Sequence, residues 1–256
     1  MNNKLNCLIA SAVFLAAGNS FAEESKLTGS ISLDLNSNFI SYGTAIWDDS
    51  DDLTDQITFN PTLSLNYQYS KALSFNAGIW LDVNDNLANS IETQETDIWI
   101  GAAYTQGITT YSATFQNWQY GGTSEEILDL GVSFDTLFNP SITLHNRLGA
   151  GASGGDEGIF LVASASHGFD VNEKFNVSIP VSVAFALTDD YHNAAGADSG
   201  FGYATVGLQG SYALSANTAL NFGLTYYVTE DDVTFNSSQG GDDNFLTWNV
   251  GYSFNF

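Results

Sequence analysis

The chain has 256 residues and a formal net charge of −24, with 29 acidic residues against five Lys and Arg. Phosphate binding needs clustered Lys and Arg, so this balance argues against nucleic acid as a partner. A single cysteine, Cys7, leaves no intramolecular disulfide.

The first 22 residues have the pattern of a secretory signal peptide. MNNK supplies a short cationic start, LIASAVFLAA an apolar run of ten residues, and Ser20-Phe21-Ala22 small residues at the −3 and −1 positions of a cleavage site. Ten residues are too few to span a bilayer as a helix. We therefore expect residues 1–22 to be removed and residues 23–256 to fold as one domain.

Strict alternation of apolar and polar residues, which is typical of strands with two different faces, recurs through the rest of the chain. Twelve segments are predicted as strands: 26–40, 55–70, 72–83, 94–105, 108–118, 125–137, 141–151, 158–169, 174–188, 200–214, 217–229 and 245–256. The alternation is weakest in 141–151 and 158–169, so we expect a register change or a β-bulge in one of these two segments.

The predicted connections alternate in length. Short ones fall at Ser70-Lys71, Gln106-Gly107, Asn139-Pro140, 171–173 and Ser215-Ala216, and long ones at 41–54, 84–93, 119–124, 152–157, 189–199 and 230–244. An even number of strands with short turns at one end and long loops at the other is typical of transmembrane β-barrels of the outer membrane. The predicted fold is therefore an all-β, twelve-stranded antiparallel barrel with short periplasmic turns and long acidic outer loops.

A soluble β-sandwich or lipocalin-like barrel is the alternative, with its apolar face turned inward. Its polar face would meet water and would normally carry charge, whereas the polar face here is built of Ser, Thr, Asn, Gln and Gly. Aromatic residues gather near segment ends, as in the interfacial girdles of membrane barrels. Most of the charge lies in the long connections. These three features favour the membrane barrel.

The chain ends on FLTWNVGYSFNF, which alternates between an aromatic, apolar face and a small or polar face. This segment is predicted to be the last strand and to pair with the strand near 27–40, which closes the cylinder. It resembles the C-terminal signal that the outer-membrane assembly machinery reads. The resemblance rests on Trp248, Tyr252, Phe254 and the terminal Phe256.

The stretches SLDLNSNFISYGTAIWDD, FNPTLSLNY and ALSFNAGIWLDVND resemble the TorF-type putative porins, a family of proteobacterial outer-membrane barrels. The resemblance covers about the first third of the chain. It implies a barrel with a pore function and offers no catalytic residues. The family often has Arg-Gly after the aromatic residue, where this chain has Tyr42-Gly43, so no role of that Arg carries over.

Several chemically distinctive residues fall on the phase that faces the barrel interior, and we predict that they line a pore. They are Asp34, Trp80, Asp82, Asp97, Trp99, Asp129, His145 and Arg147. Arg147, the only Arg, is expected to face one of the four Asp, either as a charged constriction or as a structural ion pair. The inward Trp residues either stack on a sugar ring or fill the interior. The three His residues belong to no recognisable nucleophile motif, so no enzymatic activity and no cofactor are predicted.

Acidic clusters occupy the long connections, and the densest is DDSDD, with Asp48, Asp49, Asp51 and Asp52. It lacks the Gly and the terminal Glu of an EF-hand loop. The clusters are therefore interpreted either as a solvated surface or as diffuse sites for Ca²⁺ or Mg²⁺ that bridge to lipopolysaccharide phosphates. No specific metal site is predicted.

The leading functional hypothesis is an outer-membrane channel of a Gram-negative bacterium, exported through the periplasm, for passive diffusion of small polar solutes. The acidic loops and inward carboxyl groups predict a preference for cations. Expected partners are outer-membrane lipid, lipopolysaccharide and the assembly machinery. The alternative is a non-conducting barrel that acts through its outer loops as an adhesin, receptor or structural protein. The two hypotheses differ in whether loop 41–54 or loop 230–244 folds inward and plugs the lumen.

Overall fold

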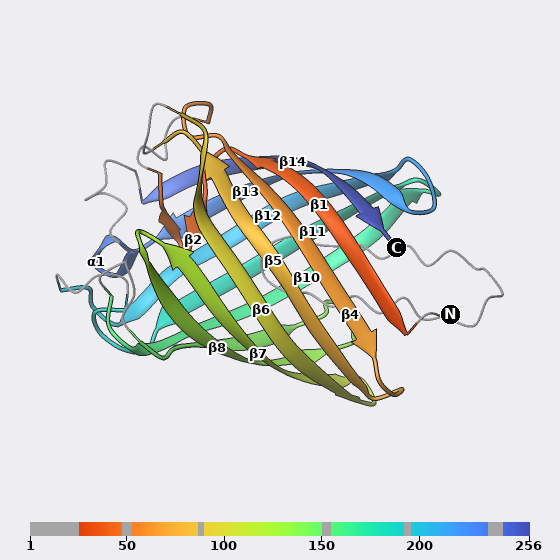
Figure 1. Cartoon of the computed structure of the whole chain (residues 1–256), viewed down its shortest axis with the longest axis horizontal. Helices are drawn as coiled ribbons and strands as arrows, with labels where there is room; N and C mark the ends of the chain where they lie inside the picture. Colours follow the sequence, from red (N-terminus) through yellow and green to blue (C-terminus); the bar gives the residue numbers. More distant parts are fainter. Residues whose placement is uncertain (1–25, 48–52, 87–89, 150–154, 192–195, 235–242) are drawn as a thin grey trace.

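Twelve antiparallel strands form a closed barrel in the computed structural model (Figure 1), which describes residues 26–47, 53–86, 90–149, 155–191, 196–234 and 243–256. The barrel strands are β1 (Leu27–Asn36), β4 (Thr58–Gln68), β5 (Leu73–Asn84), β6 (Glu92–Gln106), β7 (Thr109–Tyr120), β8 (Thr123–Phe134), β9 (Ser141–Arg147), β10 (Gly158–Asn172), β11 (Phe175–Ala186), β12 (Gly200–Ala213), β13 (Thr218–Thr229) and β14 (Asn244–Asn255). Two-residue strands β2 (Ile40–Ser41) and β3 (Thr44–Ala45) form a separate hairpin, and α1 (Asp231–Thr234) is a single turn of helix. The described residues include no helix long and apolar enough to cross a bilayer.

The first and last strands close the cylinder, as the sequence predicted. β1 pairs with β14 from Ser30 opposite Asn255 to Asn36 opposite Asn249. The backbone N–H of Gly29 donates to the carbonyl oxygen of Phe256 at 2.8 Å, and a reciprocal bond runs at 2.9 Å. Closure leaves no unpaired sheet edge, which is the condition for a sheet to lie in lipid. The twelve-stranded antiparallel barrel is therefore confirmed.

The large apolar residues of the barrel wall point outward, where a membrane barrel meets lipid. Exposed examples come from strands all round the cylinder, among them Leu33, Ile100, Leu130, Val181, Leu208 and Val250. Aromatic rings stand near the end of the barrel that carries the termini, such as Tyr69 against Phe75 and Phe254 against Phe256. We call this end the turn side and the opposite end the loop side.

Two connections differ from their predicted length. The range 119–124 was predicted to be a long loop, but β7 and β8 are joined by Gly121 and Gly122 alone. Both have positive φ angles, 57° and 80°, as the two-residue turn of a tight hairpin requires. Conversely, the turn predicted at Asn139-Pro140 extends over 135–140, and Asn139 has a φ of 41°. The loop side therefore has five long connections instead of six.

β9 and β10 explain why the alternation blurs between 141 and 169. Both faces of β10 are apolar, because Phe160 and Val162 point inward and are fully buried while Leu161 lies on the outer phase. β9 keeps a continuous register with both neighbours. A register shift between β10 and β11 lies at Asp170–Asn172, just beyond the predicted strand 158–169.

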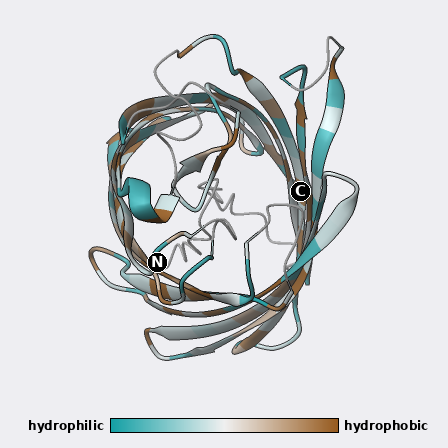
Figure 2. Ribbon diagram, turned by 90° about the vertical axis from the view of Figure 1, so that its left-hand side faces the viewer, coloured by the Kyte–Doolittle hydropathy of each residue, from teal (hydrophilic) through white to brown (hydrophobic). Residues whose placement is uncertain are grey.

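The view along the axis shows the β2–β3 hairpin and α1 inside the ring of strands (Figure 2). Residues Ser37–Trp47, which we call the inward segment, leave β1 at the loop side and fold into the lumen. α1 enters from the connection between β13 and β14. Both loops that could have plugged the barrel therefore contribute to its interior. The signal-peptide prediction, His192 and Asp48, Asp49, Asp51 and Asp52 lie outside the described residues.

Candidate functional site

The lumen is the candidate site, and its turn-side half is lined by small polar side chains. Cross-strand hydrogen bonds link several of them: Ser141 to Ser164 at 2.8 Å, Thr105 to Thr110 at 2.9 Å, and Ser211 to Asn221 at 2.8 Å. A barrel of eight strands is just wide enough for side chains to fill it, and larger barrels enclose cavities or channels. The described inner wall of this half is therefore polar and built mainly of short Ser, Thr, Asn and Gly side chains.

The inward segment gives the loop-side half a different character. It is closed on itself, because Ile46 N–H donates to the Phe39 carbonyl at 2.9 Å and Asn38 Nδ2 donates to the Trp47 carbonyl at 3.2 Å. The hairpin reverses at Tyr42 and Gly43, which have φ angles of 49° and 88°. Positive φ at both central residues is the geometry of a tight two-residue turn. The segment is thus a compact inserted hairpin.

Tyr42, at the tip of this hairpin, contacts four rings from the barrel side. The ring centroids lie 5.6 Å from Trp118, 5.4 Å from His145, 5.0 Å from Phe160 and 5.2 Å from Tyr191. Tilted and edge-on contacts at these distances are favourable for aromatic pairs. Phe160, Tyr191 and Tyr203 belong to a buried cluster that also contains Val162, Ala184, Ala186 and Val233. We call Tyr42 together with this set the inner aromatic cluster.

The inner aromatic cluster keeps its phenol groups neutral. Burial raises the pKa of Tyr42 well above its ordinary value of 10.0, and nearby Tyr191 and Asp129 raise it further. Burial likewise raises the pKa of Tyr191, although Arg147 opposes the shift. Tyr42 therefore acts as an apolar anchor that holds the inward segment against the wall.

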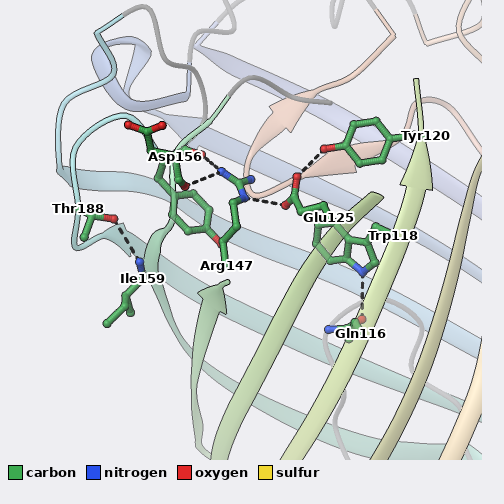
Figure 3. Close-up of polar contacts among 9 residues, drawn as sticks. Gln116, Trp118, Tyr120, Glu125, Arg147, Asp156, Ile159 and Thr188 are labelled. Atoms are coloured by element: carbon green, nitrogen blue, oxygen red, sulfur yellow. Dashed lines mark hydrogen bonds and ion pairs between the residues drawn. The ribbon is translucent and has the colours of Figure 1, made fainter. Parts of the chain in front are cut away.

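Arg147 and Glu125 form a buried ion pair behind this anchor (Figure 3). Arg147 Nε donates to Glu125 Oε1 at 2.7 Å, and Tyr120 donates its hydroxyl to Glu125 Oε2 at 2.5 Å. The guanidinium also bonds the Tyr191 carbonyl and lies 4.3 Å from the centroid of that ring. The predicted partners were the inward Asp residues, so the prediction was wrong in this detail. Glu125 lies in β8 and is 1% exposed.

Asp82 fixes the other end of the inward segment. Trp47 Nε1 donates to Asp82 Oδ2 at 2.8 Å, Asn84 Nδ2 donates to the same oxygen at 2.9 Å, and Asn60 Nδ2 donates to Oδ1 at 3.0 Å. The Thr58 hydroxyl also bonds Oδ1. Four neutral donors thus solvate one buried carboxylate. The inward segment is tied to β5 by Trp47 and to the opposite wall by Tyr42.

His145 is held by Asp129 and does not contact a nucleophile. Its Nδ1 lies 2.6 Å from Asp129 Oδ1, and Gln116 Nε2 donates to the other oxygen at 2.5 Å. His167 Nδ1 lies 3.0 Å from the Leu137 carbonyl at the turn side. Neither of these two described histidines contacts a Ser or Thr hydroxyl. A hydroxyl nucleophile activated by His therefore has no counterpart in the described residues.

The structure places every predicted pore-lining residue on the inner face, and most of them lie on the loop-side half. Trp80 packs against Phe39 of the inward segment at 5.0 Å, and Trp99 lies over Gly78, where a Cβ would meet its ring. Asp34 faces Gly251 and Asn60. His145 and Arg147 meet the inner aromatic cluster, whereas Asp34 does not. No described group of three or more His, Cys, Asp or Glu could hold a metal ion.

Sequence reasoning missed Tyr42, Glu125, Glu95 and the apolar inner residues of β10. The sequence contained one signal of this interior contact. Phe160 and Val162 are apolar residues on the otherwise polar inner face of β10, and they pack in the inner aromatic cluster.

No family model matches the chain, and the search of curated proteins found no match. Among solved structures, the NanC porin aligns with a TM-score of 0.51 and 10% identity, covering 88% of this chain and 98% of the porin. The KdgM porin aligns with a TM-score of 0.48 and 9% identity over 89% and 99% of the two chains, and the CymD monoaromatic hydrocarbon channel with 0.49 and 10% over 91% and 89%. The likeness to NanC shows a shared outer-membrane barrel fold. The TorF-type relationship stays a prediction.

Proposed function

We propose that the protein is an outer-membrane channel for passive diffusion of small polar solutes. The observation that carries this proposal is the inner face of the turn-side half, where short Ser, Thr, Asn and Gly side chains line a closed cylinder of twelve strands. A structural barrel without transport would have no need of a polar inner wall. The fold shared with the NanC porin supports the same reading.

The location is part of the proposal. The N-terminal signal pattern and the final strand ending on Phe256 suit export through the periplasm of a Gram-negative bacterium and insertion by the outer-membrane assembly machinery. The turn side would then face the periplasm and the loop side the exterior, where lipopolysaccharide is the neighbouring lipid. The resemblance to TorF-type porins agrees with this placement.

A preference for cations follows from the charges inside the described barrel. The acidic residues that point inward include Asp34, Asp82, Glu95, Asp97, Glu125 and Asp129. The inner face carries one Arg, which is neutralised by Glu125. Fixed negative charges in a narrow passage concentrate cations and repel anions.

A second candidate function rests on the inward segment. It touches β5, β7, β9, β10 and β12 and bonds α1 through the Thr44 hydroxyl and the Thr234 carbonyl at 2.8 Å. Such contacts around the circumference would suit a permanently plugged barrel that acts through its outer surface. The same contacts would equally suit a channel narrowed at its outer mouth.

Planar-bilayer recording of the purified full chain separates these functions. The channel proposal expects single-channel steps in KCl and, across a salt gradient, a reversal potential of cationic sign. Asp97→Asn should reduce the K⁺ over Cl⁻ permeability ratio, while Asp135→Asn, which removes an exposed charge from the connection between β8 and β9, should leave it unchanged. Absence of any step from heat-modifiable, folded protein would support the plugged barrel. Steps with anion preference would refute the charge argument.

A further inference from the structure

One pair of carboxyl groups inside the barrel has no counter-charge among the residues that the structure describes. Glu95 and Asp97 stand two residues apart on the inner face of β6, with their carboxyl groups within hydrogen-bond distance of each other. Glu95 is 8% exposed, and Asp97 Oδ1 is buried without a hydrogen-bond partner. Apart from this mutual contact, no donor or cation among the described residues is seen to bond either group. A buried charge is normally paired, so this arrangement lacks a positive partner.

The described part of the chain offers no cation for the pair. Arg147 is committed to Glu125. Lys26, Lys71 and Lys174 are exposed at the turn side, away from the loop-side half where β6 carries the two carboxyl groups. The other inward carboxyl groups near the inward segment have partners, since Asp82 accepts from four donors and Asp129 bonds His145. Glu95 and Asp97 are the exception in this part of the barrel.

Aromatic rings frame the pair. Trp80 on β5 and Trp118 on β7 stand directly opposite Asp97 in the two neighbouring ladders. Residues so paired have Cβ atoms about 5 Å apart, so both tryptophan side chains leave the wall beside Asp97 and on the same face. Trp99 follows Asp97 on the same face of β6, and Phe39 covers Trp80 from the lumen. Trp118, whose indole N–H is bound to Gln116 at 3.2 Å, is seen in Figure 3.

This chemistry discriminates between classes of cation. Ca²⁺ takes six to eight oxygen ligands and Mg²⁺ an octahedral shell, whereas two carboxyl groups among indole rings supply few oxygens. An alkylammonium group fits both the charge and the apolar character of this site. Its positive charge is attracted by the carboxylates and by the ring faces, and its methyl or methylene groups pack on the indoles. Caged quaternary ammonium groups are bound in this way.

We propose that Glu95, Asp97, Trp80, Trp99 and Trp118 form a binding site for organic ammonium ions in the lumen. The proposal rests on the proposed function, in that it names the substrate class the channel would prefer. The site lies beside Phe39 and Tyr42 of the inward segment, so a cation that enters from the loop side meets it at the constriction.

The test is calorimetric titration of the folded full chain in detergent with choline chloride, with its neutral isostere 3,3-dimethylbutan-1-ol, and with NaCl at the same ionic strength. Choline should bind at least tenfold more tightly than the isostere. Glu95→Gln/Asp97→Asn should weaken choline binding at least tenfold, whereas Asp135→Asn/Asp170→Asn, which removes two exposed turn-side charges, should change it less than twofold. Trp80→Leu should reduce the preference for choline over Na⁺ while it keeps both carboxylates.

Equal affinity for choline and the isostere, or undiminished choline binding by the double variant, would overturn the proposal. The second outcome would mean that the two carboxyl groups are both protonated or that choline binds elsewhere. Heat-modifiable migration on gels verifies folding, and if the double variant does not fold, Asp97→Asn alone decides. Binding is measured independently of ion current. A protein that binds choline but does not conduct KCl would therefore refute the proposed channel function and support the proposed binding site. A protein that conducts KCl and ignores choline would do the reverse.

Discussion

Tyr42→Ala should release the inward segment from the barrel wall. The substitution removes the ring that contacts Trp118, His145, Phe160 and Tyr191 at centroid distances of 5.0 to 5.6 Å. The barrel wall itself loses no hydrogen bond of its strand ladders, because Tyr42 lies in the hairpin turn between β2 and β3. The change therefore acts on docking of the segment more than on the cylinder.

The size of the effect follows from the burial of the ring. Truncating a fully buried aromatic residue to Ala costs about 3–5 kcal/mol, which is an upper bound for the partly buried ring of Tyr42, and each aromatic pair contributes about 0.5–1.5 kcal/mol of such a loss beyond area. Since about 1.4 kcal/mol is a factor of ten, the ratio of undocked to docked segment should rise roughly 150- to 4,000-fold. A segment that undocks about once in 10⁴ in the wild type would then be undocked about 1 to 30% of the time.

Single-channel recording measures this ratio as the fraction of time in a larger conductance state. Tyr42→Ala should populate that state measurably, and Tyr42→Phe, which keeps the ring, should stay close to the wild type. Tyr69→Ala is the matched control, because it removes an exposed aromatic ring at the turn side. If Tyr42→Ala has the same conductance states and occupancies as the wild type, the inward segment does not restrict the lumen and the reasoning is wrong.

Three further outcomes are expected. Arg147→Met should lower the free energy of unfolding in vesicles by about 3–5 kcal/mol, because it leaves the Glu125 carboxylate buried without its cation, and Arg147→Met/Glu125→Leu should recover most of that loss. Docking of the inward segment should be independent of pH below about 10 and weaken above it, because burial raises the pKa of Tyr42 and its deprotonation opposes docking. The fraction of time in the larger conductance state, compared at pH 8 and pH 11, measures this effect. The change should be smaller in Tyr42→Phe, which has no hydroxyl to titrate. Deletion of Phe256 should reduce the yield of inserted, heat-modifiable barrel while any barrels that form conduct normally; wild-type yield would contradict a role in assembly.

The wall of the barrel could be predicted from sequence because one physical constraint governs every strand. A strand between lipid and an aqueous lumen must alternate, and the period of two is visible in residues such as Leu73 to Val83 of β5. Closure by the final strand also follows, since an open edge cannot lie in lipid. One loop-side connection, Gly121-Gly122, was wrongly predicted to be long. Its short turn could have been predicted from the sequence, because two adjacent glycines favour a tight hairpin.

The interior could not be predicted in the same way, because its contacts join residues far apart in the chain. Tyr42 contacts Phe160 and Tyr191 only after the barrel has closed, and no local pattern in the hairpin SYGT predicts these two contacts. The pairing of Arg147 with Glu125 depends on the register of β8 against β9, in which Arg147 stands opposite Ile127 and Glu125 lies one inward position beyond it. Register is fixed by the whole sheet, so single-strand periodicity cannot supply it.

The inner aromatic cluster also constrains the order of folding. Tyr42 lies near the start of the domain, and Tyr191 and Val233 belong to its last third, so the cluster joins parts of the chain that are separated by most of the strands. Contacts of such high sequence separation form late, after loop-closure entropy has been overcome by the intervening hairpins. Near-ultraviolet dichroism of these packed rings would thus mark completion of the cylinder in a refolding experiment, whereas the far-ultraviolet signal would report the earlier accumulation of strands.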